Sequence, residues 1–156
     1  MDSFASLWFF KGLIIMTETI EVLFTGGKRV EAKIGNRMVK TDQPPQHGGG
    51  GTAPEPFQLF LVSIATCAGI YVLEFCQTRK ISTHGMALTM KCEFDKRKKV
   101  YQKLCINLKL PSGFPKEYKR SIVRVMDLSS VKKHIVRPPE FEINAFPDEG
   151  ELRSDS

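Results

Sequence analysis

The feature that most constrains the fold is an almost continuously apolar stretch, FLVSIATCAGIYVLEFC, at residues 60–76. Fifteen uncharged residues separate Gln58 from Glu74. That run is shorter than the roughly 18 to 20 residues that cross a bilayer. The stretch therefore predicts the core helix of a folded domain rather than a membrane span.

We expect this helix to run from Pro56 to about Arg79, since proline is favoured in the first turn of a helix. A helix that is apolar on every side must be covered on every side. A chain of 156 residues has little material for that. The pattern therefore predicts a homodimer in which the central helices pack together.

Strand patterns lie on both sides of the predicted helix. Before it, residues 20–26 and 29–35 alternate apolar and polar side chains around two glycines, which predicts a hairpin. Residues 37–44 predict a third strand. Residues 43–56, QPPQHGGGGTAPEP, have the composition of a flexible linker.

After the helix, the pattern predicts a second hairpin and then helical segments. The expected elements are strands at 83–96 and 99–111, an amphipathic helix at 114–128, a short helical turn at 129–135 and a last strand at 139–146. Because the strands come in hairpins rather than alternating with helices, the predicted class is α+β with antiparallel sheets.

The two ends differ from the middle of the chain. Residues 1–15 have a short apolar stretch interrupted by Lys11 and lack the features of a secretory signal. We expect them to be an N-terminal extension, or a start placed too early, ahead of a domain at 16–147 that opens with Met16. Residues 148–156 are polar and predict a flexible tail.

The composition narrows the classes of function. The net charge of +6 suggests nucleic-acid binding, but no nucleic-acid motif accompanies the basic runs, which are typical of solvated faces. The four cysteines show no C-x₂-C spacing and the three histidines do not pair at ligand intervals, so we expect neither a metal nor a cofactor. Free thiols indicate a reducing cytoplasm. The short apolar run predicts that the protein does not use a membrane.

Among the four cysteines, Cys67 has the most open surroundings, because Thr66, Ala68 and Gly69 leave room for another surface or a substrate. Cys76 follows nine residues later, half a revolution away and roughly 13 Å along a helix, so the two cannot form a disulfide. Free cysteine is a common core residue. Residue type alone therefore leaves the role of Cys67 open.

The segment APEPFQLFLVSIATCAGIYVLEF at 53–75 resembles the first-cysteine motif of the OsmC/Ohr family. The loop at 41–54, the segment at 114–135 and the strand pattern at 139–146 also resemble that family, in the expected order. The resemblance implies an intertwined α+β homodimer. Two long central helices would lie against antiparallel sheets, with two sites at the subunit interface.

Many members of the family are thiol peroxidases that act on organic hydroperoxides, with a peroxidatic and a resolving cysteine. By resemblance, Cys67 falls on the peroxidatic position and Ser129 on the second-cysteine position. Serine can hydrogen-bond a thiolate but cannot form a disulfide, so the resemblance implies an external thiol reductant. Arg29 or Lys28 is the implied cation that stabilises the thiolate.

A departure from the peroxidase branch keeps a second function open. That branch has a glutamate ten residues before the cysteine, where this chain has Phe57. The alternative is a non-catalytic protein that binds a small apolar molecule in the dimer cleft, with Phe60 and Tyr71 also lining it. A third possibility is nucleic-acid binding through the basic face.

Overall fold

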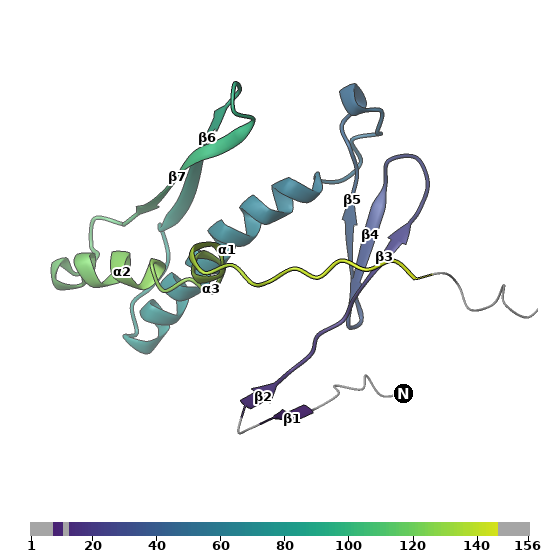
Figure 1. Ribbon diagram of the computed structural model, residues 1–156. Coiled ribbons are helices and arrows are strands. Elements are labelled where there is room, and N and C mark those ends of the chain that lie inside the picture. The colour runs from purple at the N-terminus through teal and green to yellow at the C-terminus, as the bar shows by residue number, and fades with distance from the viewer. Residues whose placement is uncertain (1–7, 11–12, 147–156) are drawn as a thin grey trace, which may run out of the picture. The chain divides into compact units, whose positions relative to one another are not determined.

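The computed structural model describes residues 8–10 and 13–146 of the chain (Figure 1). These residues form two compact units, and the boundary between the units lies within the long helix, between Ala65 and Thr66. Of the expected N-terminal extension, only residues 8–10 and 13–15 are described, and they form a short antiparallel hairpin. The predicted tail at 148–156 lies outside the described residues.

The first unit is built on a three-stranded antiparallel sheet in the order β3–β4–β5. The hairpin and third strand predicted from the sequence are confirmed. The cross-strand pair Glu21 and Lys33 forms an ion pair of 3.6 Å. The elements of this unit before the long helix are β1 (Trp8–Phe10), β2 (Leu13–Ile15), β3 (Ile20–Phe24), β4 (Val30–Ile34), β5 (Arg37–Thr41) and the 3₁₀ turn η1 (Pro45–His47).

The glycine-rich loop after β5 folds back onto Asp42, so the expectation of a flexible linker is wrong. One carboxylate oxygen of Asp42 accepts hydrogen bonds from the backbone N–H of Gly50 (3.1 Å) and from the N–H and hydroxyl of Thr52 (3.0 and 2.8 Å). The bonds from Thr52 are the main cause of a lowered pKa of this buried carboxyl. Gly49 passes so close to Gln43 that a Cβ would lie 1.8 Å from the Gln43 carbonyl oxygen.

The long helix α1 runs from Pro56 to Thr78, close to the predicted bounds. At its start, the Gln58 side chain accepts a hydrogen bond from the backbone N–H of Glu55 (3.0 Å), which is half of a capping box. At its end, Lys80 adopts a left-handed conformation (φ 56°). The N–H of Ile81 then bonds to the helix carbonyl five residues earlier (2.8 Å), as in a Schellman motif.

Helix α1 is apolar well beyond its buried stripe. Its mean hydropathy reaches 2.0 over 18 residues, so by length and composition alone it could cross a membrane. The core helix of a soluble protein has the same properties. Exposed apolar side chains on α1 include Phe57, Val62, Ile70 and Leu73. A single chain therefore does not supply the all-round cover that the sequence predicts for this helix.

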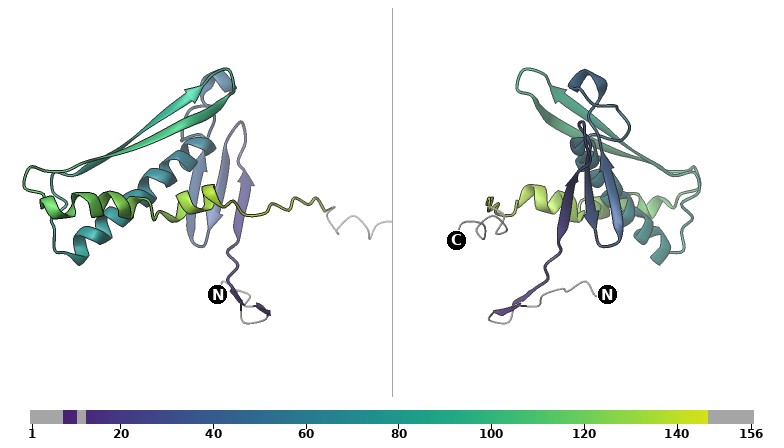
Figure 2. Two further views of the ribbon diagram at one scale, coloured as in Figure 1. Left: turned by 60° about the vertical axis from the view of Figure 1, so that its left-hand side comes forward. Right: turned by 90° about the vertical axis from the view of Figure 1, so that its right-hand side faces the viewer.

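The second unit contains the predicted hairpin and helices. Figure 2 shows β6 (Ala87–Asp95) and β7 (Val100–Lys109) as a long twisted ribbon. The pairing of the two strands shifts register between Glu93 and Phe94. After the ribbon come η2 (Lys116–Tyr118), α2 (Lys119–Met126) and α3 (Ser130–Val136). Together with the first unit, these elements confirm the α+β class with antiparallel sheets.

The core of the second unit forms where α1 meets α2 and the ribbon. Val72, Phe75 and Cys76 of α1 pack with Phe114 and with Ile122 of α2. Partly buried side chains complete this core: Ile81, Met86, Leu108, Leu110, Tyr118, Val125 and Met126. The amphipathic face predicted for α2, with Ile122, Val125 and Met126 on one side, is therefore confirmed.

The predicted last strand at 139–146 is wrong for the single chain. The described residues after α3 include no strand, and Phe141, Ile143 and Phe146 are 84 to 91% exposed. Alternating side chains favour an extended backbone, but a strand also needs the hydrogen-bonding edge of a second strand. No described strand of this chain pairs with the segment.

Candidate functional site

Cys67 lies in the middle of α1 with a half-buried thiol. The sequence predicts open surroundings for this residue, and the small neighbour Gly69 faces open space. A Cβ added at Gly69 would meet no atom within 4 Å. Gly69 is therefore not covered by another part of the described chain.

The first turn of α3 supplies the polar surroundings of this thiol. Ser129 is the N-cap of α3, and its buried hydroxyl accepts a hydrogen bond from the backbone N–H of Lys132 (3.5 Å). The Ser129 side chain and the backbone of Val131 and Ser130 are the hydrogen-bonding groups that lower the pKa of Cys67. The first N–H groups of a helix have no acceptor within the helix, so they can donate hydrogen bonds to the sulfur.

These contacts change the acidity of the Cys67 thiol. Burial raises its pKa, but the hydrogen bond from Ser129 and those from the backbone of Val131 and Ser130 outweigh burial. The pKa of Cys67 therefore lies below that of an ordinary cysteine. Because hydrogen bonds to the charged form favour that form, the site holds a thiolate at a pH where a free thiol would stay protonated.

The lowered pKa predicts how alkylation of Cys67 depends on pH. The rate follows the thiolate fraction, so the iodoacetamide reaction at Cys67 should reach half its maximal rate at a lower pH than that of an ordinary cysteine. In Ser129→Ala the midpoint should move to higher pH, because one hydrogen bond to the thiolate is lost. Peptide mass spectrometry after timed alkylation measures both.

Ser112→Ala is the matched control for this prediction, since Ser112 is exposed on the loop before η2. Its profile should coincide with that of the unaltered protein. An unchanged midpoint in Ser129→Ala would show that the Ser129 hydroxyl does not set the acidity of Cys67.

Tyr71 is a further residue of the site. It lies one turn after Cys67 on α1, and its hydroxyl is 3.1 Å from the Ser130 hydroxyl. This contact ties α1 to the first turn of α3, whose N–H groups face the thiol. The sequence suggested Tyr71 only as a pocket-lining aromatic. Its i, i+4 spacing from Cys67 was the available signal, but the partner lies 59 residues away in the chain.

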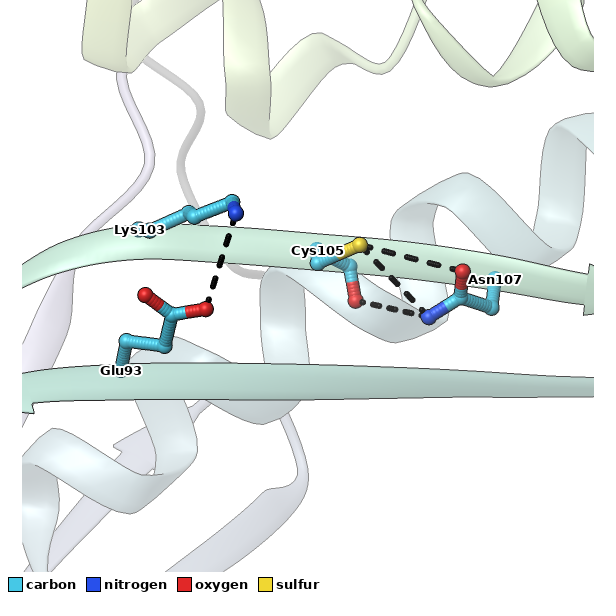
Figure 3. A network of polar contacts seen from close by, with 4 residues as sticks. All are labelled: Glu93, Lys103, Cys105 and Asn107. Atoms are coloured by element: carbon cyan, nitrogen blue, oxygen red, sulfur yellow. Dashed lines mark hydrogen bonds and ion pairs between the residues drawn. The ribbon is translucent and has the colours of Figure 1, made fainter.

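The other cysteines have different surroundings. Cys76 is fully buried in the core of the second unit, and burial raises its pKa despite the opposing charge of Arg79. Cys92 and Cys105 lie on the β6–β7 ribbon and are half-buried. In Figure 3 the Cys105 sulfur contacts the amide group of Asn107, at 3.8 Å from its oxygen and 3.6 Å from its nitrogen.

All four cysteines are free. Figure 3 also shows the ion pair between Glu93 and Lys103 (3.6 Å) beside Cys105. Both of its side chains are exposed, so the pair contributes little to stability. Hydrogen bonds lower the pKa of Cys67 and burial raises that of Cys76, so these two thiols differ in acidity.

The remaining predicted site residues lie in the first unit. Arg29 lies in the turn between β3 and β4, where its guanidinium donates a hydrogen bond to the carbonyl of Thr25 (3.2 Å). Phe57 and Phe60 lie on the first turns of α1 with ring centroids 5.2 Å apart. The structure thus brings Cys67 and Ser129 together within one unit and places Arg29 in the other. Within residues 8–10 and 13–146, no three metal-binding side chains cluster.

Residues 48–144, more than half of the chain, match the family described as OsmC-like protein. The chain belongs to the OsmC family. The match includes α1 with Cys67, the β6–β7 ribbon and α3 with its cap Ser129. A comparison with curated proteins finds no match.

Solved structures share the OsmC fold at low sequence identity. An osmotic stress induced and detoxification response protein from Psychrobacter arcticus is 20% identical, with a TM-score of 0.65 over 81% of this chain and 90% of that one. A hypothetical protein from Aquifex aeolicus is 16% identical, with a TM-score of 0.57 over 80% and 90%. A Vibrio cholerae protein, described as an organic hydroperoxide resistance protein with captopril bound in one active site, is 20% identical, with a TM-score of 0.51 over 82% and 89%.

Proposed function

We propose that this OsmC-family protein is a thiol-dependent peroxidase that reduces organic hydroperoxides through Cys67. The single observation that carries the proposal is the half-buried Cys67 thiol with a lowered pKa, held by the Ser129 side chain and the first N–H groups of α3. The solved Vibrio cholerae structure of the same fold is described as an organic hydroperoxide resistance protein, which fits this substrate class.

In the first step, the Cys67 thiolate attacks the terminal oxygen of the hydroperoxide. A sulfur–oxygen bond forms, the oxygen–oxygen bond breaks, and the departing alkoxide takes a proton to become an alcohol. The sulfur is oxidised to a sulfenic acid. The hydrogen bonds from Ser129, Ser130 and Val131 keep the sulfur ionised before the attack.

In the second step, an external thiol reduces the sulfenic acid. Ser129 stands at the second-cysteine position and has no sulfur with which to form a disulfide. A small thiol therefore attacks the sulfenic sulfur, water leaves, and a mixed disulfide forms on Cys67. A second thiol displaces the Cys67 thiolate and releases a small-molecule disulfide. A small dithiol or glutathione has the required chemistry.

The implied role of Arg29 as the cation of the thiolate stays a prediction. Replacing Arg29 with glutamine tests it without touching Ser129 or α3. If Arg29 acts on the thiolate, Arg29→Gln should slow hydroperoxide reduction and move the alkylation profile of Cys67 to higher pH.

The homodimer and the cytoplasmic compartment belong to the same proposal. A second copy would cover exposed apolar side chains of α1 such as Ile70 and Leu73. It would also offer sheet edges to residues 139–146, whose alternating apolar side chains are exposed. A reducing compartment suits a protein with four free cysteines.

An alternative function is binding of a small apolar molecule without chemistry at Cys67. The favouring observation is the pair Phe57 and Phe60, which are 52% and 41% exposed with their rings in contact. The peroxidase function predicts that the protein consumes hydroperoxide, and the binding function predicts that it does not. One experiment therefore separates them.

The experiment follows the consumption of cumene hydroperoxide by the purified protein with and without a small dithiol. The proposal predicts catalytic turnover only when the dithiol is present, with one disulfide and one alcohol formed for each hydroperoxide consumed. Consumption no faster than in a protein-free mixture would contradict the peroxidase function. Protein that is recovered with a tightly held apolar ligand would then favour the binding function.

A further inference from the structure

A cavity in the first unit lies between the β3–β4 turn and the loop that follows β5. Its volume is about 530 Å³, within the usual range for small-molecule sites. The residues that matter for its chemistry are Gly26, Gly27, Lys28, Arg29, Gln43 and His47. A smaller hollow of about 200 Å³ shares the four residues of the turn and extends along the glycine-rich loop that Asp42 holds.

The cations of this cavity have no acidic partner among the described residues. The ion pairs in that part of the chain join Lys33 to Glu21, Lys103 to Glu93, and Lys132 to Asp127. Lys28 and Arg29 take part in none of them. The positive charge of both side chains is therefore available to a ligand, and a guanidinium can bind an anionic oxygen pair with two parallel hydrogen bonds.

The backbone of the turn adds donors to the same wall. Gly26 and Gly27 both adopt left-handed conformations, with φ of 96° and 62°. Successive N–H groups in such a turn form a concave nest that suits an anion. In the described part of the chain, no hydrogen bond is recorded from the N–H groups of Gly26, Gly27 or Lys28.

The Lys28 side chain comes close to the glycine-rich loop. Its Cε lies 3.8 Å from the point that a Cβ on Gly48 would occupy, so its stem runs along the glycine-rich loop. Asp42 is the nearby acid, but its oxygens already accept four hydrogen bonds, from Gln43, Gly50 and Thr52. Asp42 does not line the larger cavity.

We propose that this cavity binds the anionic oxygen group of a small molecule, a phosphate ester or a carboxylate. Lys28 and Arg29 supply the charge, and the N–H groups of Gly26 and Gly27 supply the directed donors. Gln43 and His47, from the loop after β5, also line the cavity. The anion site does not need the Cys67 thiol, but it shares Arg29 with the peroxidase proposal, which assigns that side chain to the Cys67 thiolate.

The test is a titration of the full-length protein with inorganic phosphate and, separately, with acetate, followed by amide NMR. The expected result is saturable shifts centred on the amides of Gly26, Gly27 and Lys28 with at least one of the anions. Saturation by phosphate alone identifies a phosphate-ester site, and saturation by acetate alone identifies a carboxylate site. Cys67→Ala should bind with the same affinity.

Lys28→Gln is the decisive variant, because an exposed turn side chain can be replaced without disturbing the fold. Loss of a charged hydrogen-bond donor should raise the dissociation constant about tenfold or more. Lys40→Gln removes the same charge from an exposed position on β5 that does not line the cavity, and should leave binding unchanged. No saturable shift, or equal losses in both variants, would overturn the proposal.

Discussion

Replacing Cys67 with alanine is expected to reduce thiol-dependent hydroperoxide consumption to the rate of a protein-free mixture. The proposed chemistry starts and ends on this sulfur, and no other group of the site can carry the oxygen atom. The fold should survive, since Cys67 is only half-buried and its neighbours are small. Oxidation of a small dithiol by cumene hydroperoxide measures the loss.

Cys76→Ala is the control for this prediction. Cys76 belongs to the core of the second unit, where burial raises its pKa and keeps the thiol protonated. Its replacement should cost stability, on the order of 1 kcal/mol, and leave turnover per folded molecule unchanged. The reverse pattern, with activity lost in Cys76→Ala and kept in Cys67→Ala, would contradict the assignment of the reactive sulfur.

Replacing Ser129 with cysteine is expected to give the protein an internal resolving thiol. The Ser129 side chain is a hydrogen-bonding group that lowers the pKa of Cys67, so we expect a sulfur at this position to reach the Cys67 sulfur. After a stoichiometric pulse of hydroperoxide, Ser129→Cys should lose two hydrogens as the new disulfide forms. Intact-mass and peptide analysis under non-reducing conditions detect the bond, and a dithiol should reverse it.

The Ser129→Cys experiment needs a control for the position of the new thiol and an account of its effect on stability. Ser130→Cys places the new thiol one residue later, where the native hydroxyl faces Tyr71, and should leave Cys67 as a sulfenic acid. The change at Ser129 also removes the N-cap of α3, which costs about 1 kcal/mol and leaves the fold in place. A folded Ser129→Cys protein that forms no disulfide would show that Ser129 does not occupy the resolving position.

The sequence predicts most of the elements because their signals are local. The hairpin around Gly26 and Gly27 follows from strand alternation and two residues that tolerate positive φ. The start of α1 at Pro56 follows from the preference of proline for the first helical turn. Each of these signals lies within a few residues of the element that it specifies.

The features that the sequence did not predict depend on contacts that neither periodicity nor composition encodes. The loop after β5 has the composition of a linker, but the carboxylate of Asp42 binds Gly50 and Thr52 across it. Residues 139–146 alternate as a strand does, but pairing needs an edge that a single chain does not offer them. The local sequence pattern predicts neither the contact of the loop with Asp42 nor the strand edge that residues 139–146 need.

The candidate site also has a part that the sequence predicts and a part that depends on tertiary contacts. Helical periodicity places Cys67 mid-helix, but only the family resemblance connects it with Ser129, 62 residues later. The contact between Tyr71 and Ser130 depends on where α3 begins relative to α1, and no spacing in the sequence encodes it. The lowered pKa of Cys67 has the same origin, because its causes are groups of α3.

The most direct test of the central claim is intact-mass and peptide analysis after a stoichiometric pulse of organic hydroperoxide with a sulfenic-acid trap present. The account predicts rapid, selective labelling of Cys67, because hydrogen bonds lower the pKa of its thiol, whereas burial raises the pKa of Cys76. No labelling, or labelling spread evenly over the four cysteines, would contradict a peroxidatic role for Cys67.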